Sequence, residues 1–263
     1  MTNADAKLLS PPAAKRRMLK KLRCTSRFEK LAWADGALRV AGVDEVGRGS
    51  LFGPVVAAAV ILDPACRLRG LRDSKLLAKE QREILAARIR EYALAFAIAA
   101  VDAVRIDEIN IYQASRQAMR EAVLQLASPP DYLLVDAMTL DLECPQRSII
   151  HGDALSISIA AASIVAKVER DRMMCELDAQ YPQYGLASHK GYATPSHRAA
   201  LLEHGPSPLH RRSFAPVWMA ENSQTALMFE PEEPEERSLA QAFRLDDLCH
   251  SDAQRGIPIV GNS

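Results

Sequence analysis

Residues 41–62 read AGVDEVGRGSLFGPVVAAAVIL, and two adjacent carboxylates, Asp44 and Glu45, stand in this largely apolar stretch, followed by Arg48 between two glycines. Adjacent carboxylates repel each other, and burying a charge is costly unless a partner neutralises it. The apolar residues predict strands over 38–46 and 53–62, so both acids are expected in or at the end of a buried strand. The stretch therefore raises the question of which cation the two acids face.

The chain up to residue 220 alternates strand-like and helical segments. Apolar runs predict three further strands, over 92–101, 132–137 and 148–153. Helical periodicity predicts helices over 79–91, 107–126 and 156–177. Short connections favour antiparallel pairing of consecutive strands, and the alternation favours a mixed sheet with helices packed on it. The sequence thus predicts an α/β fold.

Composition divides the chain into three parts. We expect a basic N-terminal segment with a helix over 1–37, a catalytic domain over 38–220 and an acidic tail over 221–263. The tail holds nine acids and three Lys or Arg, whereas the preceding residues carry a net charge of +6. The Pro- and Glu-rich segment 229–238 predicts a flexible linker, and most of the tail is expected to be disordered. A basic body suits a polyanion, although the basic run 15–30 is also typical of a solvated helix face.

Composition also excludes several classes of protein. The five cysteines are scattered and form no CxxC pair, so we expect a reducing environment and neither a zinc site nor a disulfide framework. The longest unbroken apolar run, 92–101, has ten residues, whereas a membrane span needs about 20. The N-terminus lacks the apolar region of a signal peptide. We therefore expect a soluble, cytoplasmic protein that does not contact membranes.

Four acids lie in or at the ends of apolar strand-like runs: Asp44, Glu45, Asp136 and Asp153. If those strands are neighbours, the acids converge and require cations to stay ionised. Oxygen-only ligands select hard ions such as Mg²⁺ or Mn²⁺, and two such ions about 4 Å apart are the usual clamp for in-line attack on a phosphodiester. A lone Asp at a strand end is more often a turn or cap residue, so the adjacent pair carries this prediction.

The adjacent pair poses a geometric problem. Neighbouring residues of a strand point to opposite faces, so Asp44 and Glu45 cannot both aim at one site from an ideal strand. Either the strand bulges there, or Glu45 approaches from the strand end or contributes through its backbone. The glycines that follow make local distortion plausible.

Six ordered motifs resemble bacterial ribonuclease HII, the type 2 ribonuclease H, over residues 27–218. They are the opening stretch (41–62), DSK (73–75), LLVDA (133–137), GDALSISIAAASIVAKVERDR (152–172), SHKGYAT (188–194) and HRRSFAPV (210–217). The resemblance implies a ribonuclease H-like fold, two Mn²⁺ or Mg²⁺ ions and hydrolysis of the RNA strand of RNA–DNA hybrids. It also implies incision on the 5′ side of single ribonucleotides in duplex DNA. We expect a monomer, and the sequence names no protein partner.

The resemblance also assigns individual residues. The metal-binding acids fall on Asp44, Glu45, Asp136 and Asp153. The residues that recognise the RNA-to-DNA junction fall on Gly47, Arg48, Gly49 and Tyr192, and phosphate contacts fall on Lys75, Ser163 and Lys167. The chemistry is consistent, because glycine lets a backbone approach a nucleotide closely and the 2′-hydroxyl distinguishes RNA from DNA. A guanidinium can hold a phosphate bidentately.

Ordinary structural roles compete with several of these assignments. Arg48 could form a surface ion pair, Tyr192 could be a half-buried core residue, and Ser163 and Lys167 share a helix face on which either could be an ordinary helix residue. Two positions depart from the family pattern. His151 stands where Lys is usual, which would weaken phosphate attraction, and Ala78 stands where a Ser or Thr helix cap is common.

Three alternative functions stay open at this stage. Ribonuclease HIII usually carries an extra N-terminal domain and a Glu as its fourth acid, whereas this chain has Asp153 there. A proofreading-type exonuclease begins with an Asp-x-Glu pattern instead of adjacent Asp-Glu. A non-catalytic module that binds RNA–DNA hybrids would be expected to have lost at least one of the acids.

Overall fold

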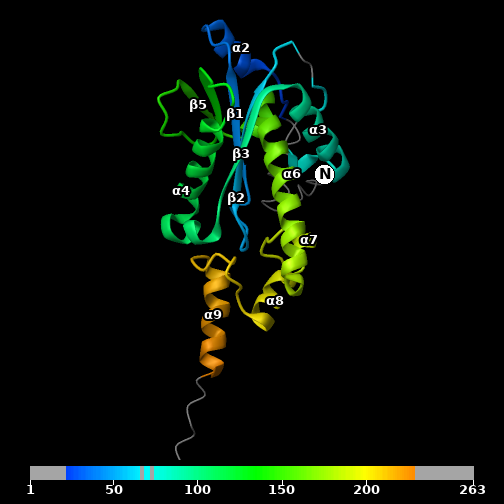
Figure 1. Ribbon diagram of the computed structural model, residues 1–263, viewed down its shortest axis with the longest axis vertical. Helices are drawn as coiled ribbons and strands as arrows, with labels where there is room; N and C mark the ends of the chain where they lie inside the picture. Colours follow the sequence, from blue (N-terminus) through cyan, green and yellow to red (C-terminus); the bar gives the residue numbers. More distant parts are fainter. Residues whose placement is uncertain (1–21, 66–67, 72–73, 229–263) are drawn as a thin grey trace, which may run out of the picture.

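The fold is described from a computed structural model, which places residues 22–65, 68–71 and 74–228 (Figure 1). Asp73 of the DSK motif, the predicted linker 229–238 and most of the predicted tail lie outside the described residues. No helix among the described residues is long and apolar enough to cross a membrane.

The described chain is built on one five-stranded mixed sheet in the order β3-β2-β1-β4-β5. The strands are β1 (Val40–Val46), β2 (Val55–Leu62), β3 (Ala93–Val101), β4 (Tyr132–Asp136) and β5 (Gln146–Ile149). β1 pairs antiparallel with β2, and β2 pairs antiparallel with β3. β4 runs parallel to both β1 and β5. The predicted mixed sheet is therefore confirmed.

Helices cover both faces of the sheet. They are α2 (Arg27–Ala34), α3 (Lys79–Tyr92), α4 (Ala103–Leu124), α5 (Gly152–Leu155), α6 (Ile157–Gln180), α7 (Leu186–His189), α8 (Pro195–His204) and α9 (Ala215–Met228), with 3-10 turns at η1 (Ser74–Leu76) and η2 (Pro182–Tyr184). Figure 1 shows α4 on one side of the sheet and α3 and α6 on the other. In that view α8 and α9 lie below the sheet, and α7 lies beside its lower end.

Alternation along β2 divides the core between the two faces. Val55, Ala57, Ala59 and Ile61 pack in the cluster that contains the buried side chains of α4. Ala58 and Val60 pack in the cluster formed with α3 and α6. Successive side chains of a strand point to opposite faces, so a continuous apolar run such as β2 is what a strand covered on both faces requires.

Gly42 brings α6 directly against β1. A Cβ built on Gly42 would lie 2.0 Å from the carbonyl carbon of Ser158 and 2.4 Å from the amide nitrogen of Ile159. Real Cβ atoms do not approach backbone so closely, so only glycine fits at this contact. The beginning of α6 is thereby held beside the strand that carries the adjacent acids.

The N-terminal helix is fastened to the body through a buried acid. Glu29 on α2 is almost fully buried, and its Oε1 accepts hydrogen bonds from the Ser156 hydroxyl at 2.5 Å and from the Ser158 amide at 2.9 Å. Thr25, just before α2, forms an isolated parallel bridge with Ser156. Because α6 begins at Ile157, these contacts attach the N-terminal helix to the start of α6.

Three predicted boundaries differ from the structure. The strand predicted over 148–153 is wrong at its end: β5 ends at Ile149, and the chain turns at His151, whose φ is +59°. The helix predicted over 107–126 begins earlier and is kinked at Asn110, whose φ is +67° and whose side chain caps the following turn. α9 continues to Met228, so the predicted boundary at residue 220 falls inside a helix.

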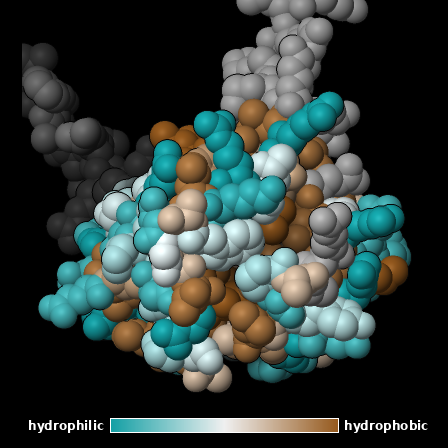
Figure 2. All heavy atoms as spheres, turned by 90° about the horizontal axis from the view of Figure 1, so that it is seen from above, coloured by the Kyte–Doolittle hydropathy of each residue, from teal (hydrophilic) through white to brown (hydrophobic). Residues whose placement is uncertain are grey.

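Polar and apolar side chains are interspersed on the end of the molecule shown in Figure 2. This mixture is usual, because more than half of the accessible surface of a folded protein is contributed by apolar atoms. Single exposed apolar side chains, such as those of Leu31 and Leu38 near α2, need no special explanation.

Candidate active site

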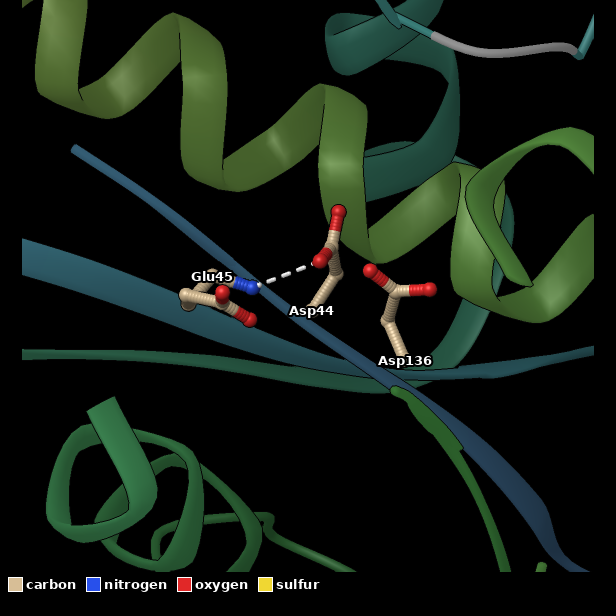
Figure 3. A group of neighbouring side chains, drawn as sticks. All are labelled: Asp44, Glu45 and Asp136. Atoms are coloured by element: carbon tan, nitrogen blue, oxygen red, sulfur yellow. Dashed lines mark hydrogen bonds between the residues drawn. The ribbon is translucent and has the colours of Figure 1, made fainter. Parts of the chain in front are cut away.

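Three carboxylates converge where β1 and β4 end. Asp44 and Glu45 lie near the end of β1, and Asp136 is the last residue of β4. Each side chain offers an oxygen within 4.8 Å of an oxygen of the other two. Figure 3 shows the group, with the Glu45 amide donating to Asp44 Oδ1 at 2.8 Å. The predicted convergence of these three acids is therefore present.

The structure also answers how adjacent strand residues meet at one site. The β1–β2 register runs without a break from Ala41 opposite Ile61 to Val46 opposite Val56, so β1 has no bulge. On its other side, pairing with β4 stops at Val43 opposite Val135. Beyond that point Glu45 has no neighbouring strand on the β4 side. Its longer side chain can therefore reach the space at the end of β4 that Asp44 reaches from the other face.

Asp136 is oriented by a backbone hydrogen bond. The amide of Gly152 donates to Asp136 Oδ1 at 2.7 Å. A Cβ at Gly152 would lie 2.5 Å from Ile159 Cδ1 and 3.2 Å from the same Asp136 oxygen. Glycine at this position therefore lets α5 lie close enough to hold the Asp136 carboxylate in place.

Asp153 lies beside this group without joining it. It is buried in α5, so its predicted position at a strand end is wrong, and α6 starts only at Ile157. The three-residue group with mutually close oxygens does not include it. Its Oδ2 is 3.4 Å from the ammonium nitrogen of Lys75, whose side chain is largely exposed. Asp153 thus adds negative charge next to the group and already faces one cation.

Burial and mutual repulsion disfavour the ionised forms of these acids. Burial raises the pKa of Asp44 well above its usual range, and Glu45, Asp136 and Asp153 raise it further, against a contact from Ser163 that lowers it. Burial also raises the pKa of Glu45, although Arg48 opposes this rise. Burial and then Asp153 raise the pKa of Asp136. With all of these carboxylates ionised, the site would hold more negative charge than its described neighbours neutralise.

The donor set fits divalent metal ions. All candidate ligands are carboxylate oxygens, which hard ions such as Mg²⁺ and Mn²⁺ prefer. Glu45 Oε2 is buried and has no hydrogen-bond partner among the described residues, and such an orphaned acceptor is costly unless a cation or a donor reaches it. Divalent ions at this position would satisfy that oxygen and offset the repulsion within the group.

The glycine-flanked arginine follows the acids directly. The stretch Gly47–Arg48–Gly49, here called the GRG turn, comes immediately after β1, and the Ser50 amide closes it by donating to the Gly47 carbonyl at 3.2 Å. Arg48 Nη1 is 3.2 Å from Glu45 Oε1, and the Arg48 side chain is 43% exposed. The structure therefore brings the GRG turn to the edge of the carboxylate group, and Arg48 forms an ion pair there.

The two glycines of the turn have different surroundings. A Cβ on Gly47, whose φ is +93°, would lie 2.2 Å from Arg170 Nε, whereas nothing lies within 4 Å of a Cβ position on Gly49. Gly47 is thus required by its conformation and by the packing of Arg170. Gly49 is the glycine whose open side can admit a ligand.

Tyr192 lies next to the GRG turn. Ser50 forms an isolated antiparallel bridge with Tyr192, and the Leu51 amide donates to the Gly191 carbonyl at 2.8 Å. The Tyr192 ring is half-buried, with the Arg170 guanidinium carbon 5.7 Å from its centroid. The structure thereby places the predicted junction residues 47–49 and 192 side by side, although they are far apart in the sequence.

The predicted phosphate contacts have protein partners. Ser163 is buried, shares a hydrogen bond of 3.0 Å with the Ser74 hydroxyl and contacts Asp44. Lys167 is one turn further along α6 and donates to Asp171 at 2.5 Å. Burial lowers the pKa of Lys167, and Asp171 opposes that shift. Lys75 and Ser163 thus border the carboxylates, whereas Lys167 is occupied by an ion pair within its own helix.

Sequence reasoning missed two buried arginines that support the site. Arg170 and Arg211 are fully buried. Arg170 donates to the carbonyls of Pro54, Lys190 and Phe52, and Arg211 donates to those of Gly53, Gly47 and Arg48. Arginine is normally a surface residue, so nothing in composition or periodicity marks these two. Their membership in the GDAL and HRRSF motifs was the available signal.

Known proteins resemble this chain over most of its length. Residues 41–217 match the family model described as Ribonuclease HII. The Ribonuclease HII of Koribacter versatilis is 63% identical over 229 residues, which cover 87% of this chain and 90% of that protein. The Ribonuclease HII of Geobacillus kaustophilus is 57% identical over 191 residues, which cover 73% of this chain and 74% of that protein.

A solved structure agrees with the sequence comparisons. The crystal structure of the ribonuclease H2 from Pyrococcus horikoshii OT3 matches with a TM-score of 0.63 and 28% identity, and the match covers 71% of this chain and 98% of that one. The predicted ribonuclease H-like fold is thereby confirmed. Fold, family model and relatives point to the same conclusion: this chain belongs to the ribonuclease HII family, whose members are type 2 ribonuclease H endonucleases.

Proposed function

We propose that this protein, whose family hydrolyses the RNA strand of RNA–DNA hybrids, also incises duplex DNA on the 5′ side of a single ribonucleotide. The observation that supports this proposal is the contact between Arg48 of the GRG turn and Glu45 of the carboxylate group, at 3.2 Å. A turn suited to a sugar and its phosphate therefore lies directly beside the residues suited to the reaction. Recognition and cleavage would then concern the same nucleotide.

Asp44, Glu45, Asp136 and Asp153 are the proposed metal ligands. Two divalent ions, Mn²⁺ or Mg²⁺, would supply a more acidic water and stabilise the charge on the departing oxygen. The chain's own contribution is to hold two of these carboxylates in place through backbone hydrogen bonds. The Gly152 amide orients Asp136, and the Glu45 amide orients Asp44.

Lys75, which pairs with Asp153, is also proposed to bind a substrate phosphate. In the described structure its ammonium lies 3.4 Å from the Asp153 carboxylate. Its exposed, flexible stem would allow it to turn to a substrate phosphate once a metal ion neutralises Asp153. Ser163 and Lys167 are proposed to contact the phosphates on either side, and for Lys167 this requires release from Asp171.

The GRG turn and Tyr192 are the proposed recognition elements. Gly49 has open space on the side where a Cβ would lie, so the backbone there can approach a ribose closely. The 2′-hydroxyl both donates and accepts hydrogen bonds, so backbone groups can distinguish it from the hydrogen of a deoxyribose. Tyr192 would stack on the nucleotide that follows the ribonucleotide. Arg48 would exchange its ion pair with Glu45 for a phosphate.

In the proposed reaction, water attacks the phosphorus on the 5′ side of the ribonucleotide. A phosphorus–oxygen bond forms to the water oxygen, and the bond to the 3′-oxygen of the preceding nucleotide breaks. The departing oxygen takes up a proton, so the products are a 3′-hydroxyl and a 5′-phosphate. Two metal ions held by the carboxylate group would support attack in line with the departing oxygen.

A panel of three duplexes tests the proposal. We expect single-turnover cleavage of a long RNA–DNA hybrid and of DNA with one ribonucleotide, and no cleavage of all-DNA duplex. Titration with Mn²⁺ and with Mg²⁺ would show which ion supports each reaction, and EDTA should stop both. Cleavage of the hybrid alone would favour a ribonuclease HIII-like specificity. Binding without cleavage at any metal concentration would favour a hybrid-binding module.

A further inference from the structure

Arg211 is fully buried, and its hydrogen-bond partners among the described residues are carbonyl oxygens. Its Nη1 donates to Gly47 O at 2.7 Å and to Arg48 O at 3.0 Å, and its Nε donates to Gly53 O at 2.9 Å. Its Nη2 is buried without a hydrogen-bond partner among the described residues. One side chain thus holds two carbonyls of the GRG turn and one of the segment that follows it.

If Arg211 served only to stabilise the fold, burying its charge would be a costly way to do so. Burying a cation carries a large desolvation penalty unless an acid pairs with it. The structure gives Arg211 no ion pair with a described carboxylate, and a second buried guanidinium, Arg170, lies close enough to repel it. Burial and then Arg170 lower the pKa of Arg211 to about 9, although Tyr192 and Asp107 oppose this shift. An apolar side chain would avoid the buried charge but would leave these carbonyls without their donor, so the fork geometry of arginine is what the position requires.

The segment that carries Arg211 also joins the GRG turn to Tyr192. The Arg211 amide donates to Leu51 O at 2.9 Å, and the Leu51 amide donates to Gly191 O at 2.8 Å. Residues 50–53 therefore lie between residues 191–192 and 209–211. Phe52 and Ser50 form isolated bridges to these two flanking segments. Movement of the Arg211 side chain would be transmitted to the turn, and movement of its backbone would be transmitted toward Tyr192.

The loop of Arg211 is itself anchored to α4. Asp107 accepts hydrogen bonds from the Arg212 amide at 2.8 Å, the Ser213 amide at 3.0 Å and the Ser213 hydroxyl at 2.5 Å. Asp107 is in the part of α4 that precedes the kink at Asn110. The backbone next to Arg211 is therefore held by Asp107, which lies outside the site, and the Arg211 side chain is held by the carbonyls of the GRG turn and Gly53.

We propose that Arg211 is a positioning residue that selects RNA-to-DNA junctions, because it sets the GRG turn in register with Tyr192. The inference rests on the proposed function, since it assigns junction recognition to those two elements. At a junction, the GRG turn must contact a ribonucleotide while Tyr192 contacts the deoxyribonucleotide that follows it. The spacing between the turn and the tyrosine must therefore match the spacing of these two nucleotides. An all-RNA strand offers many equivalent positions and depends less on that spacing.

Arg211→Lys is the informative substitution. Lysine keeps the positive charge, but one ammonium cannot reproduce the planar fork that holds three carbonyls. We expect incision at a lone ribonucleotide to fall by about 10- to 100-fold, as small displacements of positioning groups typically cause. Cleavage of the all-RNA hybrid should fall much less, and the Mn²⁺ concentration for half-maximal activity should stay the same.

Arg212→Lys is the matched control. Arg212 is adjacent in the sequence, is exposed and forms its ion pair with Glu221 on α9. We expect its two cleavage rates and their ratio to equal those of the wild type. Thermal unfolding of all variants should accompany the kinetics. An Arg211→Lys protein that loses both activities in equal proportion would overturn the inference, because a merely structural role predicts that result.

If the Arg211→Lys protein does not fold, the Asp107→Asn protein provides a second test of the inference. It weakens the anchor of the same loop at the surface and leaves both buried guanidiniums in place. The inference predicts a smaller change in the same direction, with the lone ribonucleotide more affected than the hybrid. An unchanged ratio would overturn it. Failure of the wild type to cut the lone ribonucleotide is a different result, since that would overturn the proposed function itself.

Discussion

Arg48 lies 3.2 Å from Glu45, so the arginine expected to hold a phosphate forms an ion pair with an acid expected to hold a metal ion. The two roles exclude each other at any one moment, because one guanidinium cannot be fully engaged by both partners. Arrival of metal ions would reduce the hold of Glu45 on Arg48. The pair would therefore link occupation of the carboxylate group by metal ions to release of Arg48 for a substrate phosphate.

The first prediction concerns Arg48→Ala. We expect weaker binding of nucleic acid. The plot of the logarithm of the binding constant against the logarithm of the salt concentration should become less steep, by about the amount that one phosphate contact contributes. Fluorescence anisotropy over a range of salt concentrations, with metal replaced by Ca²⁺ to prevent cleavage, measures this slope. Arg88→Ala, which removes an exposed arginine of α3, is the control for general loss of charge. An unchanged slope for Arg48→Ala would show that Arg48 stays on Glu45 in the complex.

The second prediction concerns Asp44→Asn. We expect hydrolysis to fall below detection while binding of hybrid persists, because the substitution removes one anionic ligand and leaves the basic surface intact. Gel-based cleavage and anisotropy measure the two properties separately. Asp35→Asn, at the exposed end of α2, should behave like the wild type. Near-normal turnover by Asp44→Asn would refute the assignment of the acids.

The third prediction concerns Ala78, the N-cap of α3. Its side chain forms no cap hydrogen bond, as expected from the sequence, although Gln81 Oε1 accepts weakly from its amide at 3.4 Å. Ala78→Ser should complete the cap and stabilise the fold by about 0.5–1 kcal/mol. Urea unfolding measures the change, and both cleavage rates should be unaffected. Equal or lower stability would mean that the backbone at residue 78 cannot present a hydroxyl to the helix.

The fourth prediction concerns stability at acid pH. Ser207 donates its amide to His210 Nδ1 at 2.9 Å, and His210 Nε2 is 3.2 Å from His197 Nε2. Burial, and then His197, lower the pKa of His210 from 6.5 to about 3. The unfolded chain therefore binds a proton in this interval that the folded chain does not. The stabilisation from neutral His210 is complete above pH 6.5 and is lost as the pH falls.

Urea unfolding at several pH values measures this effect. We expect the free energy of unfolding to decrease below about pH 6.5, with His210 contributing a slope of at most about 1.4 kcal/mol per pH unit. The slope should be smaller in His210→Asn and unchanged in His204→Asn, which alters a more exposed histidine. The same slope in His210→Asn as in the wild type would show that other groups cause the acid sensitivity.

The sequence was sufficient for the mixed sheet and for the convergence of three of the four predicted acids. Apolar runs located β1 and β2 within about two residues, and strand ends located Asp44 and Asp136. The sequence misplaced Asp153, because the apolar residues 148–150 resemble a strand while the turn depends on the positive φ of His151. Local patterns do not reveal such a turn when the residue is not glycine.

Other features depend on contacts between distant segments. The convergence of Glu45 with Asp44 follows from the end of pairing with β4, which no pattern in β1 contains. The burial of Arg170 and Arg211 follows from segments 50–54, 190–192 and 209–211 coming together. Periodicity reports one element at a time, so relationships among three segments become visible only in the fold.

The fifth prediction concerns Tyr192. Tyr192→Ala should lose far more activity on a lone ribonucleotide than on an all-RNA strand, because stacking on the following deoxynucleotide matters most at a junction. Tyr192→Phe should fall between Ala and the wild type if the ring dominates, and should resemble Ala if the hydroxyl dominates. Single-turnover rates of the three proteins on both substrates provide the comparison. Equal losses on both substrates would remove Tyr192 from junction recognition.

The most direct test of the central claim is a cleavage map on duplex DNA that contains one ribonucleotide and is labelled at both ends of that strand. We predict a single cut on the 5′ side of the ribonucleotide, with a 3′-hydroxyl on one fragment and a 5′-phosphate on the other. The Asp44→Asn protein should give no cut at the same concentration. A wild-type protein that leaves this duplex intact while it cuts long hybrids, or that cuts on the 3′ side of the ribonucleotide, would contradict the account.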